Sequence, residues 1–331
     1  METNNLHGGG ARATAVRDGL VRLLTHLRGQ TWPLTRLKEL VVTHDGLSVD
    51  ERTQIEQAAG RTLTFVEIGP EVGYYAAKNR GFLATTAEIV AFGDADCWPE
   101  DTWLAHLFEP FAKSTTQVVA GRTCYRGDVL GTAATTIDFM YFDSPLGRAD
   151  AECTRNFYAN NVAFRRPVFE RRRYLLEQGF YRGNCQVLGL ALQEDGVPVV
   201  FEPRARTIHR APDTWQDAVR LRLLRGADSV ELTPHLARAY APRMPWVSRV
   251  PGLAFGVLAA RFACSVRALG HQDMPEVRGA RWLACVSAIA GISLLDSVGA
   301  ALKTTGLDHL IERGDETALA YHGDGDRLSE S

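Results

Sequence analysis

Residues 89–96 read Ile-Val-Ala-Phe-Gly-Asp-Ala-Asp, an apolar run that ends in two aspartates. Four consecutive apolar residues bounded by polar ones predict a short buried strand over 89–92. Asp94 and Asp96 follow its carboxyl end two residues apart, so in extended chain both side chains point the same way. Hard divalent cations such as Mn²⁺ and Mg²⁺ prefer oxygen ligands and share them with substrate phosphates. The stretch therefore predicts a strand that presents two carboxylates to one cation, with a solvated turn as the alternative.

Upstream of this strand, the sequence alternates between helical and strand patterns. The predicted order is helix 16–27, strand 37–43, helix 49–59, strand 62–68 and helix 73–86. This alternation predicts an α/β fold with a mostly parallel sheet and helices on both faces. Ligands of such sheets bind beyond the carboxyl ends of the strands. Because Asp45 follows strand 37–43, we expect it to share a crevice with Asp94 and Asp96.

Downstream, the pattern continues and then changes character near residue 240. The predicted elements are helix 99–111, strand 117–125, strand 160–164, helix 167–178, helix 187–194 and strand 198–202. Beyond Pro242 and Pro245, two apolar stretches predict a C-terminal helical tail, 247–269 and 282–302. We therefore divide the chain into a disordered or truncated start (1–14), an α/β domain (15–240), a membrane-associating helical segment (241–310) and a disordered tail (311–331).

The composition narrows the class of protein. The 331 residues carry a net charge of −2, with 45% hydrophobic and 23% charged residues, which is typical of a globular protein. This charge disfavours a nucleic-acid surface. The six cysteines lack metal or redox spacing and the first 14 residues lack an apolar leader. We therefore expect a cytoplasmic protein with free thiols.

Several ordered motifs resemble one enzyme family. Residues 73–81 read Gly-Tyr-Tyr-Ala-Ala-Lys-Asn-Arg-Gly and residues 87–97 read Ala-Glu-Ile-Val-Ala-Phe-Gly-Asp-Ala-Asp-Cys. They resemble the A-R-N-x-G helix and the F-x-D-x-D strand of family 2 glycosyltransferases, which have the GT-A (Rossmann-like) fold. Residues 161–166 resemble the N-x-A-F-R-R strand of that family, and residues 187–209 resemble its next segment. The resemblance covers roughly residues 20–225.

The resemblance implies an activity and a set of site residues. Family 2 enzymes move a sugar from a nucleoside-diphosphate sugar to a hydroxyl acceptor, here a glycan or a lipid-linked molecule, with inversion and with Mn²⁺ or Mg²⁺. It implies that Asp45 contacts the nucleoside, Asp94 the ribose or the metal, and Asp96 the metal on the diphosphate. The other donor-binding candidates are Lys78, Asn79 and Asn161. His209 is the other metal-binding candidate. A solvated helix face for Lys78 and a packing role for His209 stay open.

Two arginines on one predicted helix are further donor-binding candidates. Arg222 and Arg225 are three residues apart, so they can share a helix face. In related transferases, arginines of this region meet the leaving diphosphate. A solvated or membrane-facing basic helix is the alternative.

The sequence departs from the family pattern in two places. The family's first strand should precede the helix at Val16, but residues 6–12 read Leu-His-Gly-Gly-Gly-Ala-Arg. We therefore expect that strand to be missing, degenerate or lost to a wrong start site. The family's Glu-Asp pair, whose Asp is the general base, corresponds here to Asn184 and Cys185. A free thiol has a pKa of ~8.5 and is mostly protonated at neutral pH. We therefore hypothesise that Cys185 lines the acceptor pocket without being the essential base. Glu194 and Asp195 are the nearest carboxylates in sequence, but they lie about two and a half helical turns beyond Cys185, far from the acceptor. Asp138 and Asp143 are alternatives that the sequence does not rank.

These departures leave two other functions open. One is a catalytically impaired, glycosyltransferase-like protein that binds nucleotide sugar. The other is a nucleotidyltransferase, which is disfavoured because no glycine-rich G-x-G-T-R loop lies near the N-terminus.

The C-terminal tail predicts contact with a membrane. Residues 282–302 are long enough for a span of ~20 residues, but Asp296 and three serines interrupt them. Residues 247–269 carry Arg249, Arg261 and Arg267, which suits a helix lying in an anionic interface. We expect peripheral association with the inner face of the cell membrane and a role in cell-envelope glycan synthesis. A helical hairpin packed on the catalytic domain is the alternative.

Overall fold

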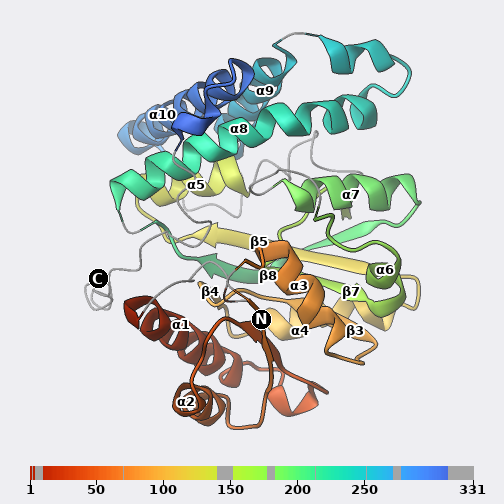
Figure 1. Ribbon diagram of the computed structural model, residues 1–331. Helices are drawn as coiled ribbons and strands as arrows, with labels where there is room; N and C mark the ends of the chain where they lie inside the picture. The colour runs from red at the N-terminus through yellow and green to blue at the C-terminus, as the bar shows by residue number, and fades with distance from the viewer. Residues whose placement is uncertain are drawn as a thin grey trace.

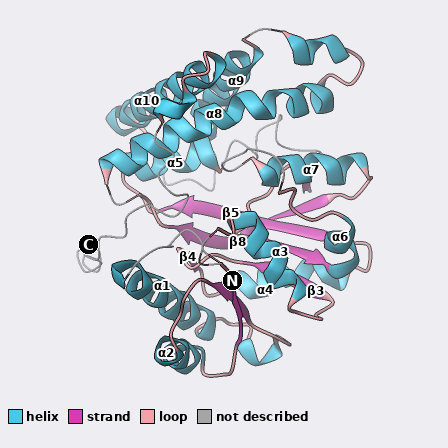
Figure 2. Cartoon of the chain, viewed as in Figure 1, coloured by secondary structure: helices cyan, strands magenta, loops and turns pink. Residues whose placement is uncertain are grey.

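The computed structural model describes residues 1, 3, 10–69, 71–139, 152–176, 183–212, 214–250, 252–270 and 277–311. Strands occupy the middle of the molecule (Figures 1 and 2). Two helices lie below them in this view, α1 (Gly10–Arg28) and α2 (Val49–Ala59), and three lie above, α8 (Trp215–Tyr240), α9 (Leu253–Ala268) and α10 (Gly279–Thr304). The predicted α/β class and the C-terminal helical tail are confirmed.

The strands form two sheets. The smaller one pairs β1 (Val41–His44) with β2 (Thr64–Glu67) in parallel through α2, as the strand–helix–strand pattern predicted. The larger one has the order β3-β7-β5-β8-β4, with β6 also on β8. Its strands are β3 (Ile89–Phe92), β4 (Cys97–Pro99), β5 (Val118–Tyr125), β6 (Cys153–Thr154), β7 (Val162–Arg165) and β8 (Val199–His209). It is a mixed sheet, because β5 and β8 are parallel while β7 runs antiparallel between β3 and β5.

The start of the chain lies against β1. Met1 donates from its backbone nitrogen to the oxygen of Val41 (2.7 Å), and the Thr3 hydroxyl donates to the oxygen of Thr43 (2.9 Å). A cavity of about 130 Å³ lies beside them, between β1 and β3. Residues 2 and 4–9 lie outside the described part of the chain. The predicted disordered range 1–14 is wrong at its end, because α1 begins at Gly10.

Two apolar cores hold the sheets and helices together. The lower core joins α1 to β1 and α2 through Leu20, Leu24, Val42 and Ile55, which confirms the helical spacing predicted for residues 16–27. The upper core packs aromatic rings of β3 and β7 against three short helices, α3 (Tyr74–Leu83), α6 (Arg166–Arg171) and α7 (Asn184–Glu194). The predicted helix 167–178 is too long, because α6 ends at Arg171.

The three C-terminal helices form one layer. Helix α8 crosses α10 closely at two glycines: a Cβ on Gly226 would lie 1.9 Å from the oxygen of Asp296, and one on Gly299 would lie 2.0 Å from that of Leu223. Beneath them lies α5 (Val129–Asp138), which the sequence analysis missed. The predicted domain boundary at residue 240 therefore falls between helices that pack together.

Candidate active site

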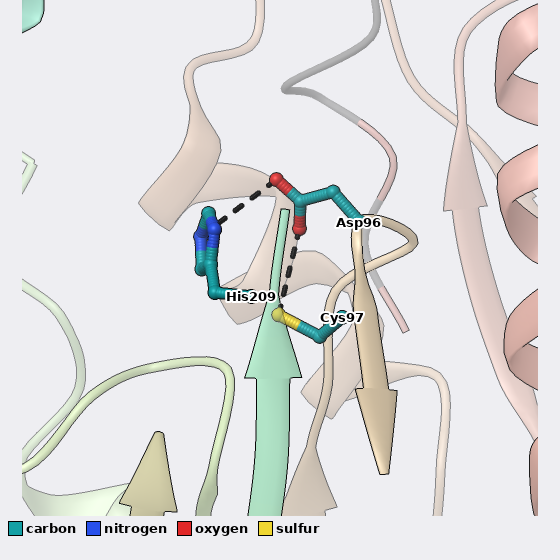
Figure 3. A group of neighbouring side chains, drawn as sticks. All are labelled: Asp96, Cys97 and His209. Atoms are coloured by element: carbon teal, nitrogen blue, oxygen red, sulfur yellow. Dashed lines mark hydrogen bonds and ion pairs between the residues drawn. The ribbon is translucent and has the colours of Figure 1, made fainter. Parts of the chain in front are cut away.

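The pairing of β4 with β8 brings an acidic and an imidazole ligand together. Cys97 lies opposite His209 in this antiparallel pair, which places Asp96 beside the imidazole. The Nε2 atom of His209 is 3.8 Å from Oδ2 of Asp96 (Figure 3). Nδ1 lies 2.7 Å from the carbonyl oxygen of Arg210. Because a carbonyl oxygen can only accept a hydrogen bond, Nδ1 is the donor of this contact, and Nε2 is the ring nitrogen that faces the carboxylate.

Cys97 is the third member of this cluster, but its protonated thiol is not suited to bind a metal ion. The donor atoms of Asp96, Cys97 and His209 all lie within 4.8 Å of one another. Burial, and to a smaller extent the neighbouring Asp96 carboxylate, raises the pKa of the Cys97 thiol well above its usual range. The protonated thiol donates to Oδ1 of Asp96 at 3.6 Å and so orients that carboxylate. One carboxylate and one imidazole, both partly exposed, fit a cation such as Mn²⁺ better than a thiol-seeking metal.

The side chains of Asp94 and Lys78 form a buried ion pair. Both side chains are 1% exposed and form an ion pair, and the Tyr74 hydroxyl donates to the other oxygen of Asp94 at 2.6 Å. The Lys78 ammonium also lies over the rings of Tyr74 and Phe92. The alternative that Lys78 is part of a solvated helix face is therefore wrong. The structure brings Asp94 to Lys78 and not into the Asp96–His209 cluster, so Asp94 would reach a metal only if this pair opened.

The other two crevice candidates, Asp45 and Asn79, differ in their surroundings. Asp45 is partly exposed in the turn after β1, and its contact with a nucleoside stays a prediction. The Asn79 amide donates to the carbonyl oxygen of Tyr174 at 3.0 Å and is nearly buried. This contact anchors the segment after α6 to α3.

Comparison with known proteins shows which family the first half of the chain resembles. Residues 14–173 match the sequence model of glycosyl transferase family 2. The matched residues are just under half of the chain, and over them the chain is similar to family 2 glycosyltransferases. The match begins in α1 and ends just beyond α6, so it includes Asp96 but not His209.

Two curated relatives and one solved structure are similar to the chain over different extents. The chain is 28% identical over 124 residues to the glycosyltransferase AglE of Haloferax volcanii, which is 37% of this chain and 40% of that protein. It is 31% identical over 105 residues to the pre-mycofactocin glycosyltransferase of Mycobacterium tuberculosis, which is 32% of this chain and 21% of that protein. The chain thus spans less than half the length of these relatives. A mannosyltransferase from Pyrobaculum calidifontis, solved in complex with GDP-Man and Mn²⁺, has a TM-score of 0.57 at 19% identity, covering 89% of this chain and 84% of that one.

The side chain of Asn161 joins neighbouring strands and a helix and is not available to bind the sugar donor. Its side chain is fully buried; Nδ2 donates to the carbonyl oxygens of Arg122 and Ala205 at 2.9 Å each, and Oδ1 accepts from the Trp103 indole at 2.8 Å. It therefore fastens β5, β7 and β8 to α4 (Trp103–Phe108). A Cβ on Gly121 would lie 2.2 Å from Oδ1, so a glycine is needed beside it. The predicted donor-binding role is not supported, because every polar atom of this side chain is used internally.

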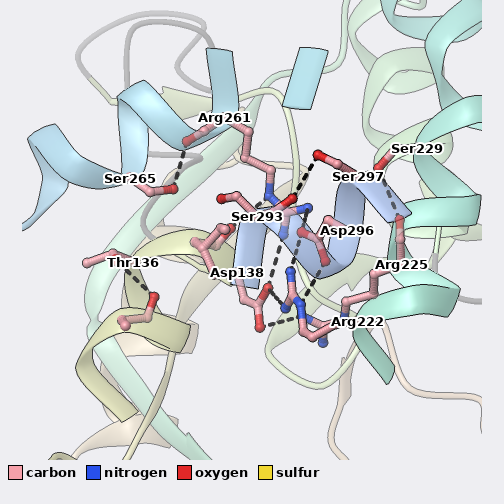
Figure 4. A network of polar contacts seen from close by, with 12 residues as sticks. Thr136, Asp138, Arg222, Arg225, Ser229, Arg261, Ser265, Ser293, Asp296 and Ser297 are labelled. Carbon is pink, nitrogen blue, oxygen red and sulfur yellow. Dashed lines mark hydrogen bonds and ion pairs between the residues drawn. The ribbon is translucent and has the colours of Figure 1, made fainter. Parts of the chain in front are cut away.

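Arg222 and Arg225 lie in a buried ion cluster (Figure 4). Arg222 contacts Asp138 at 2.7 Å and Asp296 at 2.5 Å, and Arg225 forms an ion pair with Asp138. Arg261 contacts the same two aspartates at 3.0 and 3.4 Å. Neither arginine is presented to a diphosphate in this arrangement, and neither is solvated or membrane-facing. Their geometry joins α8 to α5 and α10 instead.

Cys185 lies in the first turn of α7 and is buried. Burial raises the pKa of its thiol to about 11, and its sulfur is 3.5 Å from the Tyr75 hydroxyl. The thiol is protonated at neutral pH, which agrees with the hypothesis that it is not the base. Among the alternative carboxylates, Asp138 is held by arginines and Asp195 by Arg172 at 2.7 Å, whereas Asp143 lies outside the described residues.

Tyr125, which the sequence did not single out, packs against the imidazole of His209. Tyr125 is the last residue of β5, and it is the parallel cross-strand neighbour of His209. Their ring centroids are 5.6 Å apart with an interplanar angle of 65°. The sequence could have indicated Tyr125 by its position, because it is the last residue of the predicted strand 117–125 and the aspartates also follow strand ends.

Proposed function

We propose that this protein transfers a sugar from a nucleoside-diphosphate sugar to a hydroxyl acceptor, assisted by a divalent cation on Asp96 and His209. The observation that carries the proposal is the position of Nε2 of His209 at 3.8 Å from the Asp96 carboxylate. The family match supports the transferase class. The Pyrobaculum mannosyltransferase, whose structure contains GDP-Man and Mn²⁺, supports this donor class and this cation.

Each proposed residue has a separate task. Bound at this site, the cation would neutralise charge on the departing diphosphate. Asp96 and His209 would hold it, Cys97 would keep Asp96 oriented, and Asp45 would contact the nucleoside. Single displacement by the acceptor hydroxyl would invert the anomeric centre.

Metal binding and donor binding test the proposal together. We expect wild-type protein to bind Mn²⁺, and to bind or turn over at least one member of a panel of nucleotide sugars more strongly with Mn²⁺ than with chelator. Asp96→Asn keeps the shape of the side chain but removes its charge, so Mn²⁺ affinity and donor turnover should fall together. Asp50→Asn, on the exposed surface of α2, is the matched control. Equal Mn²⁺ affinity and turnover in Asp96→Asn and wild type would refute the metal site.

The raised pKa of Cys185 favours a second candidate, an impaired transferase that binds donor without using it. The same panel separates the two functions. Metal-dependent donor binding with neither transfer nor hydrolysis, for any acceptor tested, would select the impaired protein. Release of a nucleoside diphosphate together with a glycosylated acceptor would select the active enzyme.

We also propose that α10 rests on a membrane, which makes a lipid-linked acceptor the favoured one. Among the described residues, α10 is the one helix long and apolar enough to cross a membrane, and 28% of its most apolar window is buried. Leu283, Leu294 and Val298 follow one another along its exposed face, while Asp296 faces inward. Arg249 and Arg267, in the C-terminal part of the chain before α10, are also exposed and suit anionic headgroups. One packed face and one apolar face favour a helix lying in the interface over a span.

Vesicle binding tests this surface. We expect wild-type protein to sediment with vesicles that contain anionic lipid and to be released by high salt. Leu294→Asp combined with Val298→Asp should abolish sedimentation, because both positions are exposed and tolerate a charge in the free protein. Val49→Asp, at an exposed valine of α2 on the opposite side of the molecule, is the control (Figure 1). Wild-type protein that stays in the supernatant at low salt would refute membrane association.

A further inference from the structure

The buried ion cluster contains one arginine more than its charges require. Arg222 and Arg261 each contact both Asp138 and Asp296, so these four residues already balance. Arg225 pairs with the remaining oxygen of Asp138 and makes the cluster net positive. A buried charge in excess costs stability, and apolar residues often replace buried ion clusters without loss. Helix packing alone therefore does not account for Arg225.

The extra arginine reaches toward the metal cluster. Besides Asp138, its guanidinium donates a hydrogen bond to the Tyr125 hydroxyl. Burial raises the pKa of Tyr125 to about 12, so the hydroxyl stays neutral and can accept this bond at physiological pH. The ring of Tyr125 then stands edge-to-face against the imidazole of His209. Arg225 is thus one side chain away from a proposed metal ligand.

A second contact runs from the same aspartate. Phe139 directly follows Asp138, and its ring centroid is 5.1 Å from that of Tyr125 and 6.3 Å from that of His209. The imidazole therefore rests on two rings, and both are tied to Asp138, one through the backbone and one through Arg225. On its other edge, Nδ1 is fixed by the carbonyl oxygen of Arg210.

We propose that Arg225 and Tyr125 are positioning residues that hold the His209 imidazole in its metal-binding orientation. Asp138 anchors both, and through Arg222 and Asp296 the C-terminal helices α8 and α10 become part of the support of the metal site. The inference rests on the proposed metal-assisted function. Groups that orient a metal-bound histidine typically change metal affinity by about 10–100-fold when removed.

Two substitutions that keep the charge test this inference. Tyr125→Phe removes only the oxygen that accepts from Arg225. Arg225→Lys keeps the positive charge but loses the fork that spans Asp138 and Tyr125. We expect each to weaken Mn²⁺ binding about tenfold, measured from free Mn²⁺ by electron paramagnetic resonance without donor. Because the charge near the cation does not change, altered repulsion cannot produce this result.

Matched controls lie on the same helices or in their neighbourhood. Tyr240→Phe, at the end of α8, and Arg267→Lys, on the exposed face of α9, should leave the Mn²⁺ dissociation constant within about twofold of wild type. A second readout is the ring ¹⁵N spectrum of His209 in the metal-free protein, which reports the tautomer. Wild type should show a protonated Nδ1, and Tyr125→Phe should show a mixture.

The outcomes separate the inference from the function beneath it. If His209→Asn weakens Mn²⁺ binding while Tyr125→Phe and Arg225→Lys bind as wild type, positioning is refuted and the metal site stands. If His209→Asn has no effect, both are refuted. Should Arg225→Lys fail to fold, Tyr125→Phe decides the question alone, since it removes a single buried oxygen atom.

Discussion

Replacing Asp296 with leucine should strongly destabilise the protein. The side chain is fully buried in α10, and its two oxygens accept from Nε and Nη2 of Arg222 at 2.8 and 2.5 Å. A hydrogen bond to a charged group contributes about 1.5–3 kcal/mol, so these two bonds together suggest a loss of about 3–6 kcal/mol. In other proteins, removing one partner of a buried ion pair lowers the free energy of unfolding by about 3–5 kcal/mol. Either figure is a large part of a typical stability of about 5–15 kcal/mol.

The reason for the loss is the charge left behind, and a double-mutant cycle isolates it. Asp296→Leu leaves three arginines facing Asp138 alone. Combining it with Arg222→Met leaves Arg225 and Arg261 facing Asp138, which restores the excess charge of the native cluster. We therefore expect the double variant to be more stable than the sum of the two single losses predicts, by about 2 kcal/mol.

Urea denaturation followed by circular dichroism measures all four proteins of the cycle. Ser287→Leu, at an exposed position of the same helix, is the control for adding a leucine to α10 and should change stability by less than about 0.5 kcal/mol. A loss below about 1 kcal/mol in Asp296→Leu, or strict additivity in the cycle, would show that the cluster does not hold α10 on α8.

Further expectations concern the thiols and the pH dependence. Cys185→Ser should keep most transferase activity and Cys185→Asp should raise it, because the thiol with a pKa of about 11 supplies no base; complete loss of transfer in Cys185→Ser, with donor binding intact, would overturn this. Iodoacetamide at pH 8 should label the partly exposed Cys264 well before the buried Cys185, as mass spectrometry of digests can show. Burial alone would raise the pKa of Asp138, but Arg222, Arg225 and Arg261 hold it well below its usual range. The ionised Asp138 therefore contributes fully to the stability of the fold above its unfolded-state pKa of ~3.9, and this contribution is lost as pH falls below that value towards the lower folded-state pKa. The stability difference between wild type and Asp138→Asn should accordingly shrink from pH 6 to pH 3.

Local sequence patterns were enough to predict the elements that carry the metal carboxylate. The run of four apolar residues before Gly93 predicted β3 at its observed bounds, and the leucines of α1 predicted its buried face. The placement of Asp96 at a strand end followed from those elements. His209 was proposed from the family pattern, and the register of β4 on β8 brings it to Asp96.

Partners distant in sequence could not be predicted in the same way. Asn161 looked like a ligand because its three partners come from β5, α4 and β8, 39 to 58 residues away. Arg222 looked like a phosphate-binding residue because its aspartates lie 84 residues before it and 74 after it. Helix α5 was missed because three of its last five residues, Thr135, Thr136 and Asp138, are polar, although all are buried. Their burial depends on tertiary contacts that no local pattern encodes.

The late position of Asp296 has a consequence for synthesis of the chain. During translation, Arg222, Arg225 and Arg261 leave the ribosome before the aspartate that balances two of them. Domains generally fold as they emerge, N-terminal parts first. Until α10 has emerged, Asp138 is the only carboxylate of the cluster, and α8 has no partner at Gly226 for its closest crossing. The nascent sheet therefore cannot close its upper face early, and a chain stalled before residue 296 would expose an uncompensated positive patch to chaperones and proteases.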